Sequence, residues 1–143
     1  MRSALLLVLA ATLSVAAEAP KDAKVKEALK KLEGTWVVES SVAEGEVEAR
    51  DLGLEFVFAD DKLTVQNPQD GNTTKYTCKV DPAAAPQAID LTRAEDKYVF
   101  KYIYEIKEGA LRLCIKKDEP DQRAAEFKEG RGYTLMVLKR PKP

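Results

Sequence analysis

The side chains available for chemistry in this sequence are acidic, basic and aromatic, because none of the 143 residues is a histidine. Histidine is the commonest general base and metal ligand in proteins, and it activates many serine and cysteine nucleophiles. Carboxylates, lysine and tyrosine also catalyse reactions, but no nucleophile motif, phosphate-binding loop or metal-ligand spacing accompanies them here. We therefore expect a protein that is not an enzyme, with no cofactor and no metal site.

Asp90 and Glu105 are the carboxylates that stand out from the surface charge. Asp90 lies between Ile89 and Leu91, and Glu105 lies opposite the apolar face of a predicted strand. Two carboxylates at a fixed separation can hydrolyse glycosides, but nothing in the sequence sets the distance between these two. We expect turn capping or surface ion pairs at these positions.

Aromatic side chains form the main candidate for a binding site. The longest predicted strand, residues 97–107, places Phe100 and three tyrosines on one face, because side chains alternate along a strand. Such a face can line a pocket for a small apolar ligand, or it can fill the core of a small barrel. Both possibilities stay open at the level of sequence. The candidate ligand-binding residues are Trp36, Phe56, Phe58, Tyr76, Tyr98, Tyr102 and Tyr104.

One helix and a series of strands must position these side chains. Val25, Ala28, Leu29 and Leu32 recur at helical spacing, which predicts a helix over residues 21–32. After the helix, apolar residues alternate with polar ones and turn-forming residues separate the runs, which predicts strands. These strands cover residues 35–41, 54–58, 63–66, 74–80, 87–92, 97–107, 110–117, 123–128 and 133–140.

The loops between these strands have the length of hairpin connections, with no room for crossover helices. The pattern therefore predicts an all-β fold, as an antiparallel meander that closes into a barrel or packs as a sandwich. Residue spacing by itself leaves both arrangements, barrel and sandwich, open, and in either one the N-terminal helix precedes the strands.

The two cysteines, Cys78 and Cys114, have opposite positions in the alternation of their strands. Cys78 belongs to the apolar set of its strand, whereas Cys114 lies opposite the apolar set of its own. Thiols on opposite faces of a sheet cannot be bridged without backbone movement. We favour separate thiols over a disulfide, although a β-bulge would reverse one side chain.

The N-terminus has the three-part layout of a secretory signal peptide. Arg2 supplies a positive charge, residues 4–15 form an apolar run, and small residues allow cleavage after Ala16, Ala17 or Ala19. The run is shorter than the roughly 20 apolar residues that span a bilayer, so we expect no membrane insertion. The predicted organisation is a cleaved signal peptide over residues 1–19 and a barrel domain over 20–143, exported to the periplasm or the extracellular space.

Gly34 and Trp36 form a Gly-x-Trp motif that resembles the opening motif of lipocalins and related calycin barrels. In that superfamily an arginine late in the barrel covers the tryptophan, and Arg140 stands at the matching place. The resemblance implies a structural clasp in which Arg140 stacks on Trp36. Trp36 can form the floor of a ligand cavity, but we favour a role in plugging the closed end of the barrel.

Six short phrases occur in order along the chain: LEGTW at 32–36, AIDLT at 88–92, IYEI at 103–106, LRLCI at 111–115, EF at 126–127 and VLKR at 137–140. This ordered set resembles an uncharacterised lipocalin-like domain family of exported planctomycete proteins. The family implies an eight-stranded barrel in an exported bacterial protein, and it implies no established activity.

The net charge is −1, and the 23 basic and 24 acidic residues are interspersed along the chain. This balance argues against a nucleic-acid partner, which requires a basic face. The leading hypothesis is an exported non-catalytic domain that binds a small apolar ligand in its barrel. The alternative is a structural or interaction module of the cell envelope with an envelope protein as partner. Its support is an apolar patch that we expect from side chains pointing away from the inner faces, at Val57, Val99, Ile103 and Met136.

Overall fold

The computed structural model describes residues 19–143. The predicted signal peptide, with its cleavage positions after Ala16 and Ala17, lies outside the described residues. Within 19–143 no helix has the length and apolar character needed to cross a membrane. The elements are α1 (Ala19–Leu32), β1 (Gly34–Ala43), β2 (Glu46–Val47), the 3-10 turn η1 (Ala49–Asp51), β3 (Glu55–Ala59), β4 (Lys62–Gln66), β5 (Thr73–Asp81), β6 (Ala88–Arg93), β7 (Val99–Lys107), β8 (Ala110–Lys116) and β9 (Tyr133–Lys139).

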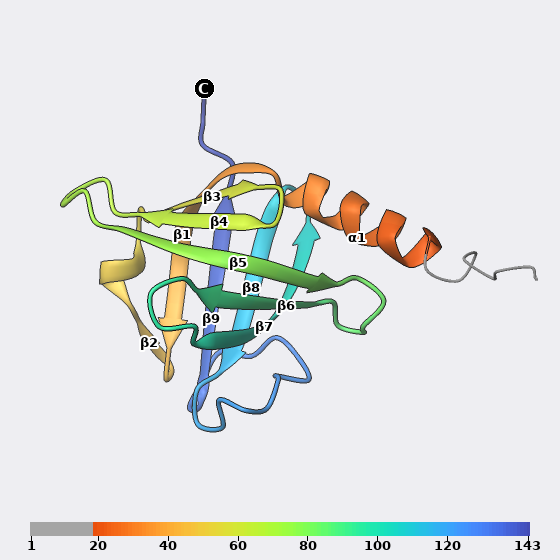
Figure 1. Cartoon of the computed structure of the whole chain (residues 1–143). Coiled ribbons are helices and arrows are strands. Elements are labelled where there is room, and N and C mark those ends of the chain that lie inside the picture. Colours follow the sequence, from red (N-terminus) through yellow and green to blue (C-terminus); the bar gives the residue numbers. More distant parts are fainter. Residues whose placement is uncertain (1–18) are drawn as a thin grey trace, which may run out of the picture.

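The strands form one antiparallel sheet in which each strand from β3 to β9 pairs with the next, and β9 pairs back onto β1. The two-residue strand β2 pairs only with the last two residues of β1, so the closed barrel has eight strands, β1 and β3 to β9. This closure confirms the predicted eight-stranded meander barrel with one N-terminal helix. In Figure 1, β3 to β5 cross β1 and β9 at a steep angle, as strands do in a small barrel.

Strand β1 contains a register shift that changes which residues face the interior. Its pairing with β9 shifts between Val38 and Ser40, which marks a β-bulge at Glu39. Before the bulge Trp36 and Val38 are buried, and after it Ser41 is fully buried. A bulge adds one residue to one strand of a pair, so the inner face passes from even to odd residues and brings a hydroxyl into the barrel.

The two ends of the barrel are covered by different elements. At one end α1 packs against β5, and we call this the closed end. The opposite end, here the open end, carries residues 43–54, the turns at 67–72 and 94–98 and the loop 117–132. Figure 1 places α1 on the right, next to the arrowhead of β5, and η1 and β2 on the left.

Loop 117–132 differs from the prediction, which put a strand at 123–128. It contains no strand and lies on the outer face of the sheet, where Ala124 packs against Ile103, Cys114 and Leu135. Arg123 fixes it by donating hydrogen bonds to the Tyr102 carbonyl oxygen at 2.8 Å and the Asp90 carboxylate at 2.6 Å. Apolar side chains of this segment therefore pack on the outer face of the sheet, although the segment does not pair with any strand.

The apolar patch expected from Val57, Val99, Ile103 and Met136 is not formed. Ile103 is fully buried beneath loop 117–132, and Met136 points into the barrel as part of the main core. Only Val99 of the four is exposed, and Val57 is half-buried. The prediction was wrong at Ile103 because a loop covers the outer face there, and at Met136 because its position in the alternation had been assigned to the wrong face.

Cys78 and Cys114 are free thiols on opposite sides of the sheet. Cys78 is buried in the main core, whereas Cys114 lies under loop 117–132 with its Sγ 3.7 Å from the Lys128 carbonyl oxygen. Burial raises the pKa of Cys78 to about 12 and also raises the pKa of Cys114. The arrangement agrees with the separate thiols that the alternation favours.

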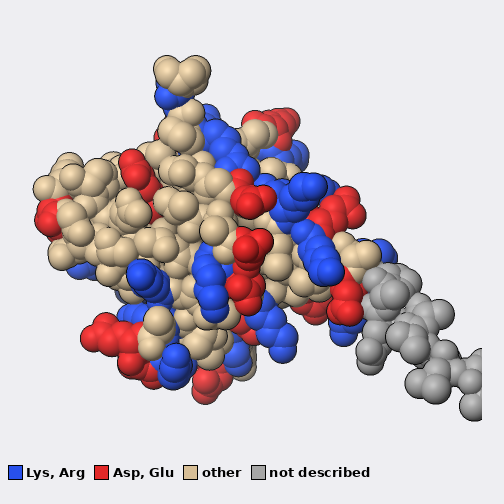
Figure 2. All heavy atoms as spheres, turned by 45° about the horizontal axis from the view of Figure 1, so that its top comes forward, with Lys and Arg blue, Asp and Glu red and all other residues tan. Residues whose placement is uncertain are grey.

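The surface carries both signs of charge. Figure 2 shows blue and red side chains interspersed around α1, and a larger uncharged area on the left of this face, where the turn between β4 and β5 lies. Within residues 19–143, four of the five exposed large apolar residues also lie at the open end. They are Val47, Leu52, Tyr98 and, at the start of β7, Val99.

Candidate ligand-binding site at the open end of the barrel

The closed end is filled by side chains, with Trp36 at its centre. Trp36 is 2% exposed, and its Nε1 donates a hydrogen bond to the Leu32 carbonyl oxygen at 2.8 Å. The Arg140 guanidinium lies over the indole ring, 3.8 Å from the ring centroid, and donates to the carbonyl oxygens of Thr35 and Lys31. Trp36 and Arg140 thus tie the end of α1 to both β1 and the segment after β9.

Gly34 makes the approach of Arg140 possible. Its φ is +104°, a backbone conformation that favours glycine, and a Cβ at this position would lie 2.8 Å from an Arg140 guanidinium nitrogen. The Gly-x-Trp motif is therefore explained by packing at the closed end.

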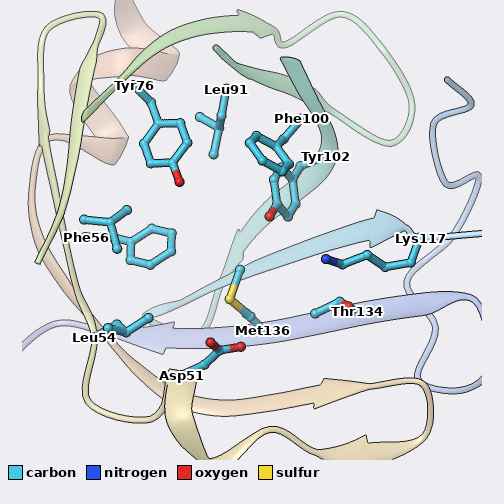
Figure 3. Close-up of a pocket in the computed structure, with 11 residues that line it drawn as sticks. Asp51, Leu54, Phe56, Tyr76, Leu91, Phe100, Tyr102, Lys117, Thr134 and Met136 are labelled. Carbon is cyan, nitrogen blue, oxygen red and sulfur yellow. The ribbon is translucent and has the colours of Figure 1, made fainter. Parts of the chain in front are cut away.

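The open end contains a cavity of about 210 Å³ inside the barrel (Figure 3). Residues from β3 to β7, β9 and the flanking segments contribute to its wall, so six of the eight barrel strands take part in it. The lining residues are Asp51, Leu54, Phe56, Val65, Tyr76, Leu91, Phe100, Tyr102, Lys117, Thr134 and Met136.

Four aromatic rings form much of the wall, those of Phe56, Tyr76, Phe100 and Tyr102. Tyr76 and Phe100 meet edge to face with their ring centroids 6.1 Å apart, a favourable aromatic geometry. Figure 3 shows the hydroxyls of Tyr76 and Tyr102 pointing into the enclosed space. The rings supply an apolar surface whose edges carry hydrogen-bonding groups.

Tyr98 extends this aromatic cluster to the rim. Its ring centroid lies 4.7 Å from that of Phe100, and the ring is 44% exposed. The Arg93 guanidinium stacks over both rings, 5.8 Å and 5.2 Å from their centroids. Asp96 accepts two hydrogen bonds from Arg93, which lowers the pKa of this carboxyl to about 2 and holds the arginine in place.

Thr134 supplies the most unusual polar atom of the cavity wall. The residue is 6% exposed, and its Oγ1 has no hydrogen-bond partner among residues 19–143. A buried hydroxyl without a partner costs about 1–3 kcal/mol. Thr134 contributes to the cavity wall, but its Oγ1 is buried beneath the surface of that wall and does not border the open space.

Opposite charges stand on two sides of the cavity. Asp51 is held by a hydrogen bond of 2.9 Å from the buried Ser41 hydroxyl, so the bulge in β1 fixes this carboxylate at the wall. Lys117, the exposed first residue of loop 117–132, extends its ammonium group toward the cavity from the other side (Figure 3).

Burial raises the pKa of Tyr102, and the Tyr76 hydroxyl and the Asp51 carboxylate raise it further. Burial also raises the pKa of Tyr76. Both phenols therefore stay protonated in neutral solution, where they can donate and accept hydrogen bonds.

The structure divides the predicted ligand-binding residues among three places. Phe56, Tyr76 and Tyr102 come together in the cavity wall, and Tyr98 lies at the rim. Trp36, Phe58 and Tyr104 are buried in the filled part of the core. Trp36 lies at the closed end and away from the cavity, where it acts as a plug and not as the floor of a ligand site.

Sequence analysis missed the polar half of the cavity and most of its aliphatic wall. Thr134 and Met136 alternate with Leu138, which is completely buried, so the three side chains share the inner face of β9. Asp51 had no comparable signal, because only the fold brings η1 to the barrel interior. The lining residues that the prediction omitted are Asp51, Leu54, Val65, Leu91, Lys117, Thr134 and Met136.

The two carboxylates that stood out in the sequence do not line the cavity. Asp90 pairs with Arg123 at 2.6 Å, and Glu105 pairs with Arg112 at 2.5 Å. These are the surface ion pairs expected from the sequence. Within residues 19–143 no group of three or more Asp, Glu, Cys or His side chains is placed to hold a metal ion.

No family model, no curated protein and no solved structure matches this chain.

Proposed function

We propose that this protein is an exported, non-catalytic barrel that binds a small apolar ligand in the cavity at its open end. The observation that supports it is the cavity of about 210 Å³ inside the barrel at the open end, where four aromatic rings form much of the wall. Binding sites in small barrels lie at the mouth, where apolar walls and a few polar groups converge.

The size of the cavity limits the ligand. An engineered cavity of about 150 Å³ binds benzene, whereas drug-sized ligands occupy about 300–1,000 Å³. A volume of about 210 Å³ suits a molecule of one ring with a small substituent. A fully enclosed long-chain fatty acid does not fit this space.

The proposal is tested by chemical-shift titration of the purified domain with toluene, indole and octanoate. We expect saturable shifts of backbone amides around Phe56, Tyr102 and Met136 for at least one ring compound, and none around Trp36. The absence of saturable shifts with all three probes, or shifts confined to the closed end, would contradict the proposal.

A cavity-filling variant provides the matched control. Val65 lines the cavity and Val99 is exposed at the start of β7. Val65→Phe should abolish the shifts while Val99→Phe preserves them, since only the first ring enters the space. Equal binding by both variants would place the ligand elsewhere.

The export of this protein and its membership of the planctomycete lipocalin-like family are also proposals. They are supported by the ordered phrases of the sequence and the eight-stranded barrel. Expression of the full chain in a Gram-negative host, followed by mass spectrometry of the periplasmic fraction, tests export. Cleavage after Ala16, Ala17 or Ala19 is expected, and an uncleaved chain retained in the cytosol would contradict it.

An interaction module of the cell envelope is the second candidate function. The observation that favours it is the position of Val47, Leu52, Tyr98 and Val99, which are exposed on open-end segments. Cross-linking in the native envelope should then recover a defined partner, and replacing Val47 and Leu52 by serine should prevent its recovery. A monomer that recovers no partner would argue against this candidate.

A further inference from the structure

We infer that the ligand carries a primary ammonium group at the end of its apolar part, and that Asp51 binds this group inside the cavity. The inference rests on the proposed function, because the apolar part of the ligand fills the cavity described there. It assigns the chemical class of the ligand, a small amine with one ring. Three features of the cavity support it: the carboxylate of Asp51, two accessible tyrosine hydroxyls and the aromatic rings of the wall.

Asp51 is a half-buried carboxylate that lacks a cationic partner in the chain. Asp90 is also half-buried, but it pairs with Arg123 at 2.6 Å. Asp51 forms no ion pair with any side chain of residues 19–143, and it accepts one hydrogen bond, from the buried Ser41 hydroxyl. A charge that is partly removed from water is stabilised by an opposite charge at short range. Because Asp51 lines the cavity, a ligand can supply that charge.

The hydroxyls of Tyr76 and Tyr102 point into the same space as the Asp51 carboxylate (Figure 3). Neither phenol oxygen makes a hydrogen bond within the described part of the chain, and neither is shielded from solvent as the Thr134 Oγ1 is. Burial raises the pKa of Tyr102, and the Tyr76 hydroxyl and the Asp51 carboxylate raise it further. The three groups are therefore close enough to act on one another.

A primary ammonium group matches these three groups. It has three N–H donors and no acceptor, and the cavity offers it the Asp51 carboxylate and the phenol oxygens of Tyr76 and Tyr102 as acceptors. A neutral hydroxyl can also form hydrogen bonds here, but it leaves the negative charge of Asp51 without a counter-charge. The ammonium group satisfies the acceptors and the charge together.

The rings of Phe56, Tyr76, Phe100 and Tyr102 add a second attraction for a cation. The face of an aromatic ring carries partial negative charge, and several rings around one site favour an ammonium group. The same rings provide apolar contacts for the ring of the ligand. The volume of about 210 Å³ accommodates one ring with a short amine-bearing arm.

Two cationic side chains of the protein lie near the cavity, and neither cancels this attraction. Arg93 stacks on the Phe100 ring, and its charge is balanced by its ion pair with Asp96. Lys117 contributes to the wall, but the residue is exposed, so water and salt screen its ammonium group. The half-buried Asp51 therefore determines the sign of the charge that the interior favours.

Four probes with one ring and a short arm separate these features: benzylamine, benzyl alcohol, ethylbenzene and phenylacetate. They differ in the group at the end of the arm, which is an ammonium, a hydroxyl, a methyl or a carboxylate group at neutral pH. Chemical-shift titration of the purified domain gives their dissociation constants. We expect benzylamine to bind about tenfold more tightly than ethylbenzene, the factor that a hydrogen bond to a charged group supplies, and more tightly than the other two probes.

The variant Asp51→Asn keeps the size of the side chain and an acceptor for Ser41 but removes the charge. It should bind benzylamine about tenfold more weakly than the parent. Its affinity for ethylbenzene should be unchanged, which also shows that the variant is folded. Glu55→Gln is the matched control, because Glu55 is also half-buried but does not line the cavity. This control should bind all four probes as the parent does.

The variant Lys117→Gln tests the opposite charge at the cavity wall. Removing this cation should leave benzylamine binding at least as tight as in the parent, because the ammonium group of the ligand loses a repulsive neighbour. Weaker binding of benzylamine to Lys117→Gln would contradict the inference.

The outcomes separate the inference from the proposed function. If ethylbenzene or benzyl alcohol binds as tightly as benzylamine, or if phenylacetate binds most tightly, the inference is overturned while ligand binding stands. If Asp51→Asn retains the preference for benzylamine, another group recognises the ammonium and the inference is likewise overturned. If none of the four probes binds, the proposed function fails and the inference fails with it.

Discussion

The closed end and the open end of this barrel are built from the same eight strands, yet one is filled and the other holds a cavity. At the closed end, Trp36 is anchored by one hydrogen bond and covered by Arg140. At the open end no comparable plug exists among the lining residues, and half-buried aromatic side chains surround about 210 Å³. The difference places the packed part of the barrel interior at one end of the sheet and the cavity at the other.

Each end also has one buried hydroxyl without a partner, and these two hydroxyls have different surroundings. Tyr104 belongs to the core and lines a groove beside α1, whereas Thr134 contributes to the wall of the open-end cavity. The same defect in hydrogen bonding therefore costs stability at both ends of the barrel. The following predictions test this division between the ends.

The largest effect is expected for Trp36→Ala. Removing a buried indole from a filled core costs about 3–5 kcal/mol. Phe100→Ala, at the half-buried wall of the cavity, should cost about half as much, because its ring is only partly removed from water. Urea denaturation of both variants provides the comparison, and equal losses would show that the two ends are packed alike.

Arg140→Ala is expected to cost about 1 kcal/mol. The change removes the contact of the guanidinium with the Trp36 ring and its hydrogen bonds to two carbonyl oxygens. Arg140→Lys keeps the charge but lacks the planar group that stacks on the ring, so it should recover less than half of the loss. Full recovery by lysine would mean that charge alone matters at the closed end.

Thr134→Val and Tyr104→Phe are each expected to raise the free energy of unfolding by about 1 kcal/mol. Each variant removes a buried hydroxyl that lacks a partner, and the retained shape preserves the packing. Urea denaturation without ligand measures both effects. Thr64→Val, at a half-buried position of β4, is the control and should change stability by less than half as much. A destabilised Thr134→Val would indicate that this hydroxyl already has a partner.

The smallest effect at neutral pH concerns the tyrosines, whose ionisation matters only in alkaline solution. Burial raises the pKa of Tyr76, Tyr102 and Tyr104 above the ordinary tyrosine value of about 10. The folded state therefore retains these protons at pH values where the unfolded state releases them. The stability that they contribute is fully present below about pH 10 and is lost as the pH rises toward the folded pKa values.

Denaturation at pH 8 and pH 11 tests this dependence at the two ends. Tyr104→Phe at the closed end and Tyr102→Phe at the open end should each lose less stability than the parent between these pH values. The difference should vanish below pH 9. An unchanged alkaline loss in both variants would show that other groups, such as the buried thiol of Cys78, dominate it.

The fold was predictable to a large extent because its signals are local. Alternation along the strands identified all eight barrel strands and the inner face of β7, and helical spacing identified α1, which begins two residues earlier than predicted. The ninth predicted strand, over 123–128, failed because alternation does not distinguish a paired strand from a loop with one covered face. The first predicted strand was extended to Ala43 by its pairing with β9.

By itself, the sequence determined the antiparallel strands, the helix and the separation of Cys78 from Cys114, because side-chain alternation and helical periodicity are properties of neighbouring residues. Only the tertiary structure decided where the barrel is hollow. The cavity depends on side chains from distant strands failing to fill one end, and on a bulge in β1 that turns Ser41 inward to hold Asp51. The sequence pattern of neighbouring residues does not encode the space between side chains of distant strands, so the cavity is visible only in the tertiary structure.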